Sequence, residues 1–383
     1  MTVPVPREVI ELMASREHRL HHWLWHEVRN SWLSYPEDVQ QKVRDVGWEP
    51  PRPALDERRR PILDNDAGED FLFMHRQMLV DVSRMLARIQ DPNYPRVLVW
   101  TKLPPPGDPV FPVPPPWFDP ERGDEVDRRT FFETIQRLKS DIFYEKRLVW
   151  WQQLFTDPAF LRDVTLGQLG TLIEQSIHAS MHNRWSAAPA GFRPDPGPDQ
   201  GHTIDPLWDD PRYDHLADTY ASHVNPHFWS LHGWVDDRVE DWKAANDVYG
   251  NSFWKGTWVG KMPRVGEPPP AQPPEEAPPA QPPEEAPADE LELQPAAGGR
   301  PVALSEHGLR HAHGSRVAEH RAVARTQVLG REHPQAAPPG AHALMGHSHH
   351  GAGDREEMEE LVKVIGQCGI FYEGYSRVVT DIL

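Results

Sequence analysis

Residues 20–28 read LHHWLWHEV, and this stretch is the starting point for the fold of the chain. His22 and His26 are four residues apart, so on a helix their imidazole rings project from the same face. Two imidazoles placed in this way lie within reach of one metal ion. The surrounding pattern predicts a helix over Arg7 to Trp32.

The same spacing recurs in residues 177–185, IHASMHNRW, where His178 and His182 form a second pair. Two single histidines lie on patterns with strong helical periodicity: His75 in FLFMHRQML and His232 in NPHFWSLHGWVDD. Neutral imidazole is a good ligand for copper, zinc, iron and nickel, and helices of a bundle can converge side chains on a buried ion. One such pair alone is more often a solvated helix face or a pair of core histidines, so the recurrence favours a metal site.

A zinc protease is a poor match to these pairs. Its motif places glutamate directly after the first histidine, whereas Trp23 follows His22 and Ala179 follows His178. A single cysteine, Cys368, excludes an internal disulfide and thiolate-based zinc or iron–sulfur sites. The ligands of any metal are therefore nitrogen or oxygen atoms.

Helical patterns dominate the first 262 residues, and alternating strand patterns are scarce. Long proline-rich connections, Glu49 to Pro61 and Leu103 to Pro120, suit a helical bundle with wrapped loops. The predicted fold is mainly α, a helical bundle over residues 1–262. The further helices expected in it are Gly68 to Ile89, Arg128 to Phe155, Thr165 to Trp185, and Pro226 to Asn246.

The composition changes near Met262, because all 15 tryptophans precede that residue. Residues 263–299 are rich in proline and glutamate and predict an extended acidic linker. Residues 300–353 contain nine of the 21 histidines and predict a disordered tail. This tail could collect copper, or it could be a low-complexity extension without a metal function. Residues 354–383 regain an amphipathic pattern, predicting a helix that could dock back and cover the site as a removable plug.

The net charge limits the partners of the chain. The formal charge is −18, from 58 acidic and 40 basic residues, and no basic stripe is present, which argues against nucleic acid. Residues 1–10 lack the pattern of a secretion signal, and no apolar run approaches the length of a membrane span. These features predict a cytoplasmic protein with no membrane partner.

Three segments resemble a known family. HHWLWHEV and the later EDFLFMHRQML resemble the first copper motif of arthropod hemocyanins and prophenoloxidases. NPHFWSLHGWVDD resembles their second copper motif, of the form DPxFYRWHxxIDD, which tyrosinases and catechol oxidases share in outline. This resemblance lies within residues 16–242. It implies two copper ions, with His22, His26 and His75 on the first and His232 on the second.

The second histidine pair departs from the family pattern. The family reads LHNxGH there, and MHNRWS aligns His182 and Asn183 but places Ser186 where a histidine is expected. His178 lies one turn before His182 on the same helix face and could supply the missing nitrogen. The predicted ligands of the second copper are therefore His178, His182 and His232. A second departure is the longer interval from His26 to His75, which we interpret as an inserted loop.

The resemblance implies a copper-dependent oxidase that uses dioxygen to oxidise or ortho-hydroxylate a phenol, catechol or aminophenol. Asn183 would then help a carboxylate to position a water molecule, with Glu174 as the candidate carboxylate; both could instead be helix-surface groups. Asp236, four residues after His232, would stiffen the helix near the metal. A non-catalytic, hemocyanin-like dioxygen- or copper-binding protein is the alternative. A helical protein without metal is a third possibility, because of Ser186. The sequence leaves the substrate and the oligomeric state open.

Overall fold

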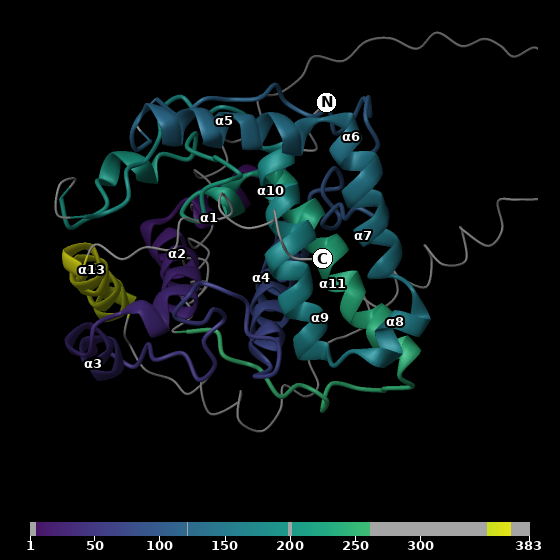
Figure 1. Ribbon diagram of the computed structural model, residues 1–383, viewed down its shortest axis with the longest axis horizontal. Helices are drawn as coiled ribbons and strands as arrows, with labels where there is room; N and C mark the ends of the chain where they lie inside the picture. Colours follow the sequence, from purple (N-terminus) through teal and green to yellow (C-terminus); the bar gives the residue numbers. More distant parts are fainter. Residues whose placement is uncertain (1–4, 121, 198–200, 261–350, 369–383) are drawn as a thin grey trace, which may run out of the picture. The chain divides into compact units, whose positions relative to one another are not determined.

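The computed structural model describes residues 5–120, 122–197, 201–260 and 351–368, and over these residues the chain is helical, with no β-strand (Figure 1). The mainly α class is therefore confirmed. These residues belong to one compact unit, formed by Met1–Val265 and His347–Leu383. The predicted linker, almost all of the predicted tail, and the end of the chain after Cys368 lie outside the described residues.

The first predicted helix is two helices, α1 (Arg7–Met13) and α2 (Arg16–Ser31). The break falls at Ser15, whose backbone is extended with φ −60° and ψ 144°, so a single helix over this range was a wrong prediction. The Ser15 hydroxyl is 2.9 Å from His18 Nδ1, in the first turn of α2. A short helix that was not predicted, α3 (Glu37–Asp45), follows α2.

Helices α4 (Ala67–Ile89) and α11 (Pro226–Ala245) match the sequence prediction to within one residue at each end. At the start of α11, the Asn225 side chain accepts a hydrogen bond from the backbone N–H of His227, and Pro226 occupies the first turn. Both residues are favoured at helix starts, because asparagine satisfies a free N–H group and proline lacks one. These signals are local, which explains the accurate boundaries.

The segment predicted as one helix from Thr165 to Trp185 is continuous but contains a π-helical turn. Helix α9 (Leu166–Ile173) begins with a capping box between Thr165 and Gln168. The π turn, η3 (Glu174–His178), leads into α10 (Ala179–Trp185). A π turn holds one extra residue and is frequent at functional sites. Here the turn ends on His178, one of the predicted ligands.

The range predicted as a helix from Arg128 to Phe155 is interrupted. Helix α5 (Glu125–Lys139) ends before Ser140, whose extended backbone redirects the chain and whose side chain caps the next helix. That helix runs through α6 (Asp141–Phe143), a second π turn, η2 (Tyr144–Leu148), and α7 (Val149–Leu154). A further helix, α8 (Pro158–Asp163), was not predicted.

Helices α4 and α9 approach each other closely at glycines. A Cβ atom on Gly68 would lie 2.1 Å from the carbonyl oxygen of Gly167, and one on Gly170 would lie 2.1 Å from that of Gly68. Only residues without a side chain fit at such distances. Helix α4 also packs against α11, to which Arg76 is joined by ion pairs with Asp236 (2.6 Å) and Glu240 (2.8 Å).

Helix α13 (Gly351–Cys368) packs against α2 and α3 (Figure 1). Its apolar face is buried, and it consists of Met358, Leu361, Val362, Val364 and Ile365. Glu359 on the same helix pairs with Arg16 of α2 at 2.8 Å. The amphipathic helix predicted after the linker is therefore present, and it docks on the helix that carries the first histidine pair. None of the described helices is long and apolar enough to cross a membrane.

Candidate metal centre

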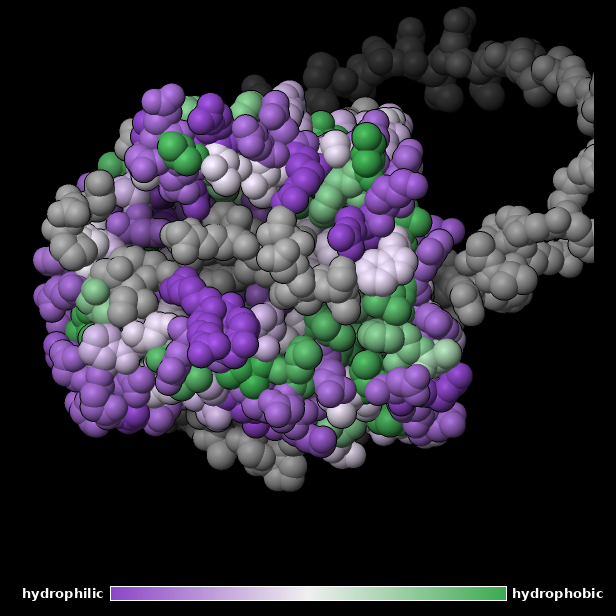
Figure 2. All heavy atoms as spheres, in the orientation of Figure 1, coloured by the Kyte–Doolittle hydropathy of each residue, from purple (hydrophilic) through white to green (hydrophobic). Residues whose placement is uncertain are grey.

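Six histidines from four helical segments meet in the interior. His22 and His26 come from α2, His75 from α4, His178 and His182 from the η3–α10 segment, and His232 from α11. Each of them is between 0 and 2% exposed, whereas the face of the molecule in Figure 2 is largely hydrophilic. All six predicted ligand positions thus converge, and five of them form two overlapping groups that could hold metal ions: His22, His26 and His75, and His75, His178 and His232.

The second histidine group, His178, His182 and His232, is tight. The Nε2 atoms of His178 and His182 are 3.1 Å apart, those of His182 and His232 are 3.2 Å apart, and those of His178 and His232 are 3.3 Å apart. An ion bound at about 2.0 Å to imidazole nitrogens in tetrahedral geometry has ligand atoms about 3.3 Å apart. The triangle of nitrogen atoms therefore has the dimensions of one side of such a site.

The first histidine group, His22, His26 and His75, is more open, with the possible ligand atoms all within 4.8 Å of one another. The ring centroids of His22 and His26 are 4.9 Å apart. His75 also belongs to a group with His178 and His232, and its ring stacks on that of His232 at 4.2 Å with an interplanar angle of 6°. The two groups therefore contact each other through His75 and His232 and form one cluster.

Backbone carbonyl groups fix the orientation of three of these rings. His22 Nδ1 lies 2.5 Å from the Thr219 carbonyl oxygen, His75 Nδ1 lies 2.9 Å from that of Phe71, and His182 Nδ1 lies 2.7 Å from that of Leu216. A carbonyl oxygen only accepts, so Nδ1 carries the proton and Nε2 keeps its lone pair. Metal-binding histidines are held in the same way in many proteins.

The buried Nε2 atoms are acceptors that need a partner other than a protein hydrogen-bond donor. Those of His22 and His75 are buried and make no hydrogen bond with any described residue. An unsatisfied buried acceptor costs about 1–3 kcal/mol. Nitrogen lone pairs that face one another at this depth fit a cation better than they fit one another. The donor atoms and the burial of these residues therefore suit metal ions.

Burial keeps these imidazoles neutral. Desolvation lowers the pKa of His22 to about 4 and that of His182 to about 3, against an ordinary value of 6.5. The pKa values of His26, His75, His178 and His232 are also well below that value, first because of burial and second because of neighbouring histidines. Only the neutral ring binds a metal, so the site is ready to bind at neutral pH.

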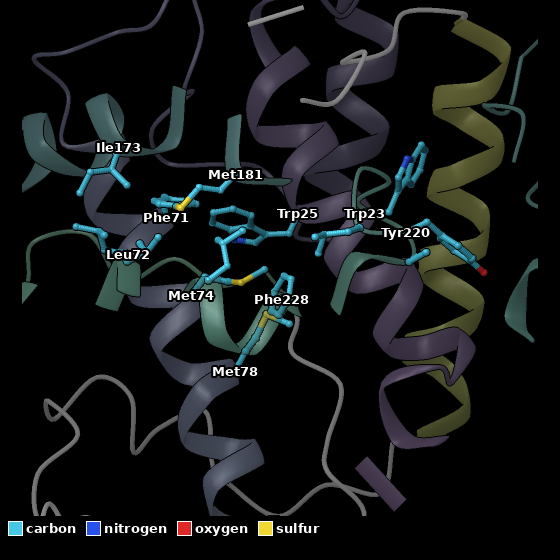
Figure 3. Close-up of a cluster of buried hydrophobic side chains, with 14 of the residues drawn as sticks. Trp23, Trp25, Phe71, Leu72, Met74, Met78, Ile173, Met181, Tyr220 and Phe228 are labelled. Atoms are coloured by element: carbon cyan, nitrogen blue, oxygen red, sulfur yellow. The ribbon is translucent and has the colours of Figure 1, made fainter. Parts of the chain in front are cut away.

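Aromatic and sulfur-containing side chains enclose the cluster. The ring of Phe228 is centred 4.0 Å from that of His232 and 5.5 Å from that of His22, so it contacts both groups. Phe71 packs on His75 and His178, at 4.7 and 4.8 Å. Figure 3 shows Phe71 and Phe228 in one apolar layer with Trp25, Met74 and Met181. This layer keeps the surroundings of the histidines dry.

Ser186 stands where the family pattern expects a histidine, and Asn183 is the candidate catalytic amide. Both make hydrogen bonds to groups outside the cluster. The Ser186 hydroxyl donates to the carbonyl of Asn183 and accepts from Trp117 Nε1, each at 2.8 Å. The Asn183 amide donates to the carbonyl of Ala179 at 3.0 Å, one turn back on its own helix. His178, and not Ser186, lies beside His182 and His232 in the second histidine group.

Glu174 and Asp236 are both engaged in ion pairs. Glu174 is 3% exposed and accepts hydrogen bonds from both terminal nitrogens of Arg29, at 2.6 and 2.7 Å. Its carboxylate also lies 3.9 Å from His26 Nδ1. It is therefore not a solvated helix-surface residue. Asp236 pairs with Arg76, so it links α11 to α4 immediately beyond His232 and His75.

The cluster and its ion pair also involve Arg29, Phe71 and His223, which no spacing in the sequence marks as site residues. His223 is fully buried, with its ring centred 4.8 Å from that of His22. It lies in η5 (Ser222–Val224), a short turn with no periodic pattern that could mark it in the sequence. Chemically, the arrangement can bind one or two soft or borderline metal ions through neutral imidazoles in a water-poor interior.

No protein-family model matches the chain, and no curated protein is similar to it.

Proposed function

We propose that this protein binds two copper ions and uses dioxygen to oxidise, or to hydroxylate at the ortho position, a small phenol, catechol or aminophenol. The observation that carries the proposal is the convergence of six buried histidines, in two groups that contact each other. His22, His26 and His75 would hold one ion, and His178, His182 and His232 the other. The resemblance of residues 16–242 to hemocyanin and tyrosinase motifs supports copper over other metals.

Copper at these positions would pass electrons from the substrate to dioxygen. The protein's own part is to hold the ligands still and to keep water out. The carbonyls of Thr219, Phe71 and Leu216 hold three rings with Nε2 directed to the cluster. Burial keeps all six rings neutral, and Phe71 and Phe228 limit the approach of water.

One observation favours the alternative, a non-catalytic protein that binds dioxygen or copper reversibly. Every histidine of the cluster is at most 2% exposed, and Phe228 lies against both groups. Dioxygen is small enough to reach such a site through thermal fluctuations, whereas a phenol needs an opening of its own size. Access to the site therefore separates the two functions.

The test is catechol oxidation by the full chain after reconstitution with copper. The proposal expects dioxygen consumption and quinone formation in proportion to bound copper, and neither in protein loaded with zinc. A His232→Phe variant, which lacks one ligand of the second group, is expected to lose turnover. Reversible dioxygen uptake without quinone formation would replace the oxidase with the carrier, and failure to bind copper would overturn both.

A further inference from the structure

His223 is a seventh buried histidine at the edge of the first histidine group, and the proposed function does not use it. It is fully buried. Burial holds the pKa of His223 well below 6.5, and the backbone of Met13 only partly opposes that shift. By distance and angle, neither ring nitrogen makes a hydrogen bond with a described residue. Burying an imidazole with so little compensation is unfavourable, so a role beyond packing is expected.

The position of His223 suggests what that role is. Its ring is centred 4.8 Å from that of His22, at an interplanar angle of 63°. It does not belong to the set of ligand atoms formed by His22, His26 and His75. His223 is thus next to one member of the first group without being part of it, as expected for a ligand that holds an ion before it reaches its final position.

His18 extends this arrangement toward the surface. It precedes His22 by one turn of α2, so both rings project from the same side of the helix. His18 is only partly buried, and Ser15 hydrogen-bonds its Nδ1 at 2.9 Å, which leaves Nε2 for an ion. His22 therefore lies between the other two histidines: His18 is one turn away on α2, and the ring of His223 is centred 4.8 Å from that of His22.

The positive charge of Arg19 also acts on His223 and would oppose a cation there. Its guanidinium group, however, donates to the carbonyl oxygens of Ala14, Asp210, Tyr213 and Tyr220. These acceptors offset the charge locally. The guanidinium group of Arg19 thus already has acceptors for its own charge.

We infer that His18, His223 and His22 form a route by which copper ions pass from the surface into the first histidine group. The inference rests on the proposed copper site and adds a means of filling it. Cu(I) can be bound by two nitrogen ligands. The ion can therefore move from one pair of histidines to the next and stay coordinated in a buried, apolar interior. The ion keeps its charge throughout, and no electron transfer is involved.

The test is the rate of Cu(I) uptake by the metal-free full chain, measured anaerobically from the loss of colour of a chromogenic Cu(I) chelator. His223→Phe and His18→Phe are expected to slow uptake about tenfold and to leave the final copper content unchanged. His227→Phe is the matched control, because that half-buried ring contacts Phe111 and belongs to neither group. It is expected to load at the wild-type rate.

Wild-type uptake rates in both variants would overturn the route. A lower final copper content in correctly folded His223→Phe protein would also overturn it, because His223 would then be a permanent ligand. His18→Phe alters a partly exposed position, so it remains informative if His223→Phe does not fold. Failure of the wild-type chain itself to bind copper would instead contradict the proposed function.

Discussion

Three imidazoles of the cluster are oriented by a backbone carbonyl group, and this contact also determines what the other ring nitrogen can bind. Where Nδ1 donates to a backbone carbonyl, as in His22, His75 and His182, Nε2 is left as an acceptor in an interior with few donors. The carbonyl of Phe71 belongs to the same helix as His75, one turn back. The carbonyls of Thr219 and Leu216 belong to the loop before α11, so that loop is part of the site although it supplies none of the six histidines.

The contrast between His182 and Ser186 gives the first prediction. His182→Phe removes a nitrogen from the tight triangle and is expected to abolish binding of one copper per chain. Ser186→Ala is expected to retain both coppers but to lower the free energy of unfolding by about 1–3 kcal/mol, because Trp117 Nε1 loses its partner. Copper analysis and urea unfolding measure the two effects. Loss of copper from Ser186→Ala would show that the family register applies after all.

Glu174 gives the second prediction. Glu174→Gln leaves the buried guanidinium of Arg29 without its carboxylate partner and is expected to destabilise the protein by about 3–5 kcal/mol. Thermal unfolding measures this loss. Arg44→Ala, which removes a more exposed ion pair with Glu37, is the control and is expected to cost at most about 1 kcal/mol. Equal effects in the two variants would mean that the Glu174 pair contributes no more than a surface pair.

The sequence located the six histidines because their helices are amphipathic and their spacing is periodic. It could not identify the partners of Ser186 or Glu174, because Trp117 and Arg29 are 69 and 145 residues away in the chain. It favoured His178 as the third ligand because Ser186 stands where the family has a histidine, but it could not show that His178 reaches the site. Only the packing of η3 and α10 against α11 brings His178, and not Ser186, to His232.

Among the elements, the contact of α4 with α9 matters most for the site, because these helices lead to His75 and His178. The glycines at this crossing allow the two backbones to touch. Gly68→Ala would place a Cβ atom 2.1 Å from the Gly167 carbonyl oxygen and is expected to force the helices apart. Loss of both stability and copper affinity should follow.

The third prediction is therefore that Gly68→Ala destabilises the protein by about 1–3 kcal/mol, the usual range for overpacking. It should also weaken copper binding. Arg88→Ala, on an exposed position near the end of the same helix, is the control and should change stability by about 0.5 kcal/mol or less. Thermal unfolding and competition with a copper chelator measure the two quantities. A Gly68→Ala variant as stable as Arg88→Ala would contradict the close crossing.

Helix boundaries were predicted well where apolar periodicity and capping residues mark them. They were predicted poorly where a single extended residue ends a helix. The long helices α4 and α11 follow from periodicity and capping. The breaks at Ser15 and Ser140 come from single residues with extended backbone, which no apolar pattern reveals. The π turn before α10 is equally invisible in the sequence, since it changes the spacing by one residue without breaking the helix.

The whole molecule buries many histidines, and this gives its stability a specific pH dependence. The folded pKa values are lowered, to about 4 for His22 and about 3 for His182, while the unfolded value is near 6.5. Below pH 6.5 the unfolded chain binds more protons than the folded chain, so folding stability falls as pH falls. The stabilisation is complete above pH 6.5 and decreases progressively toward pH 4.

The fourth prediction is a steep loss of stability of the metal-free protein between pH 6.5 and 4. The shift of His22 alone corresponds to about 3 kcal/mol over that interval. Urea unfolding at a series of pH values measures the slope, and His22→Phe, which cannot be protonated, is expected to reduce it. A flat profile would mean that protonated imidazoles are accommodated in the folded interior.

If the chain holds two copper ions in two histidine groups, anaerobic titration of the metal-free full chain with Cu(I) should end at two equivalents per chain. The His26→Phe and the His182→Phe variant, each of which alters a different group, should each bind one equivalent. Binding of one equivalent or none by the wild-type chain, or of two by either variant, would contradict it.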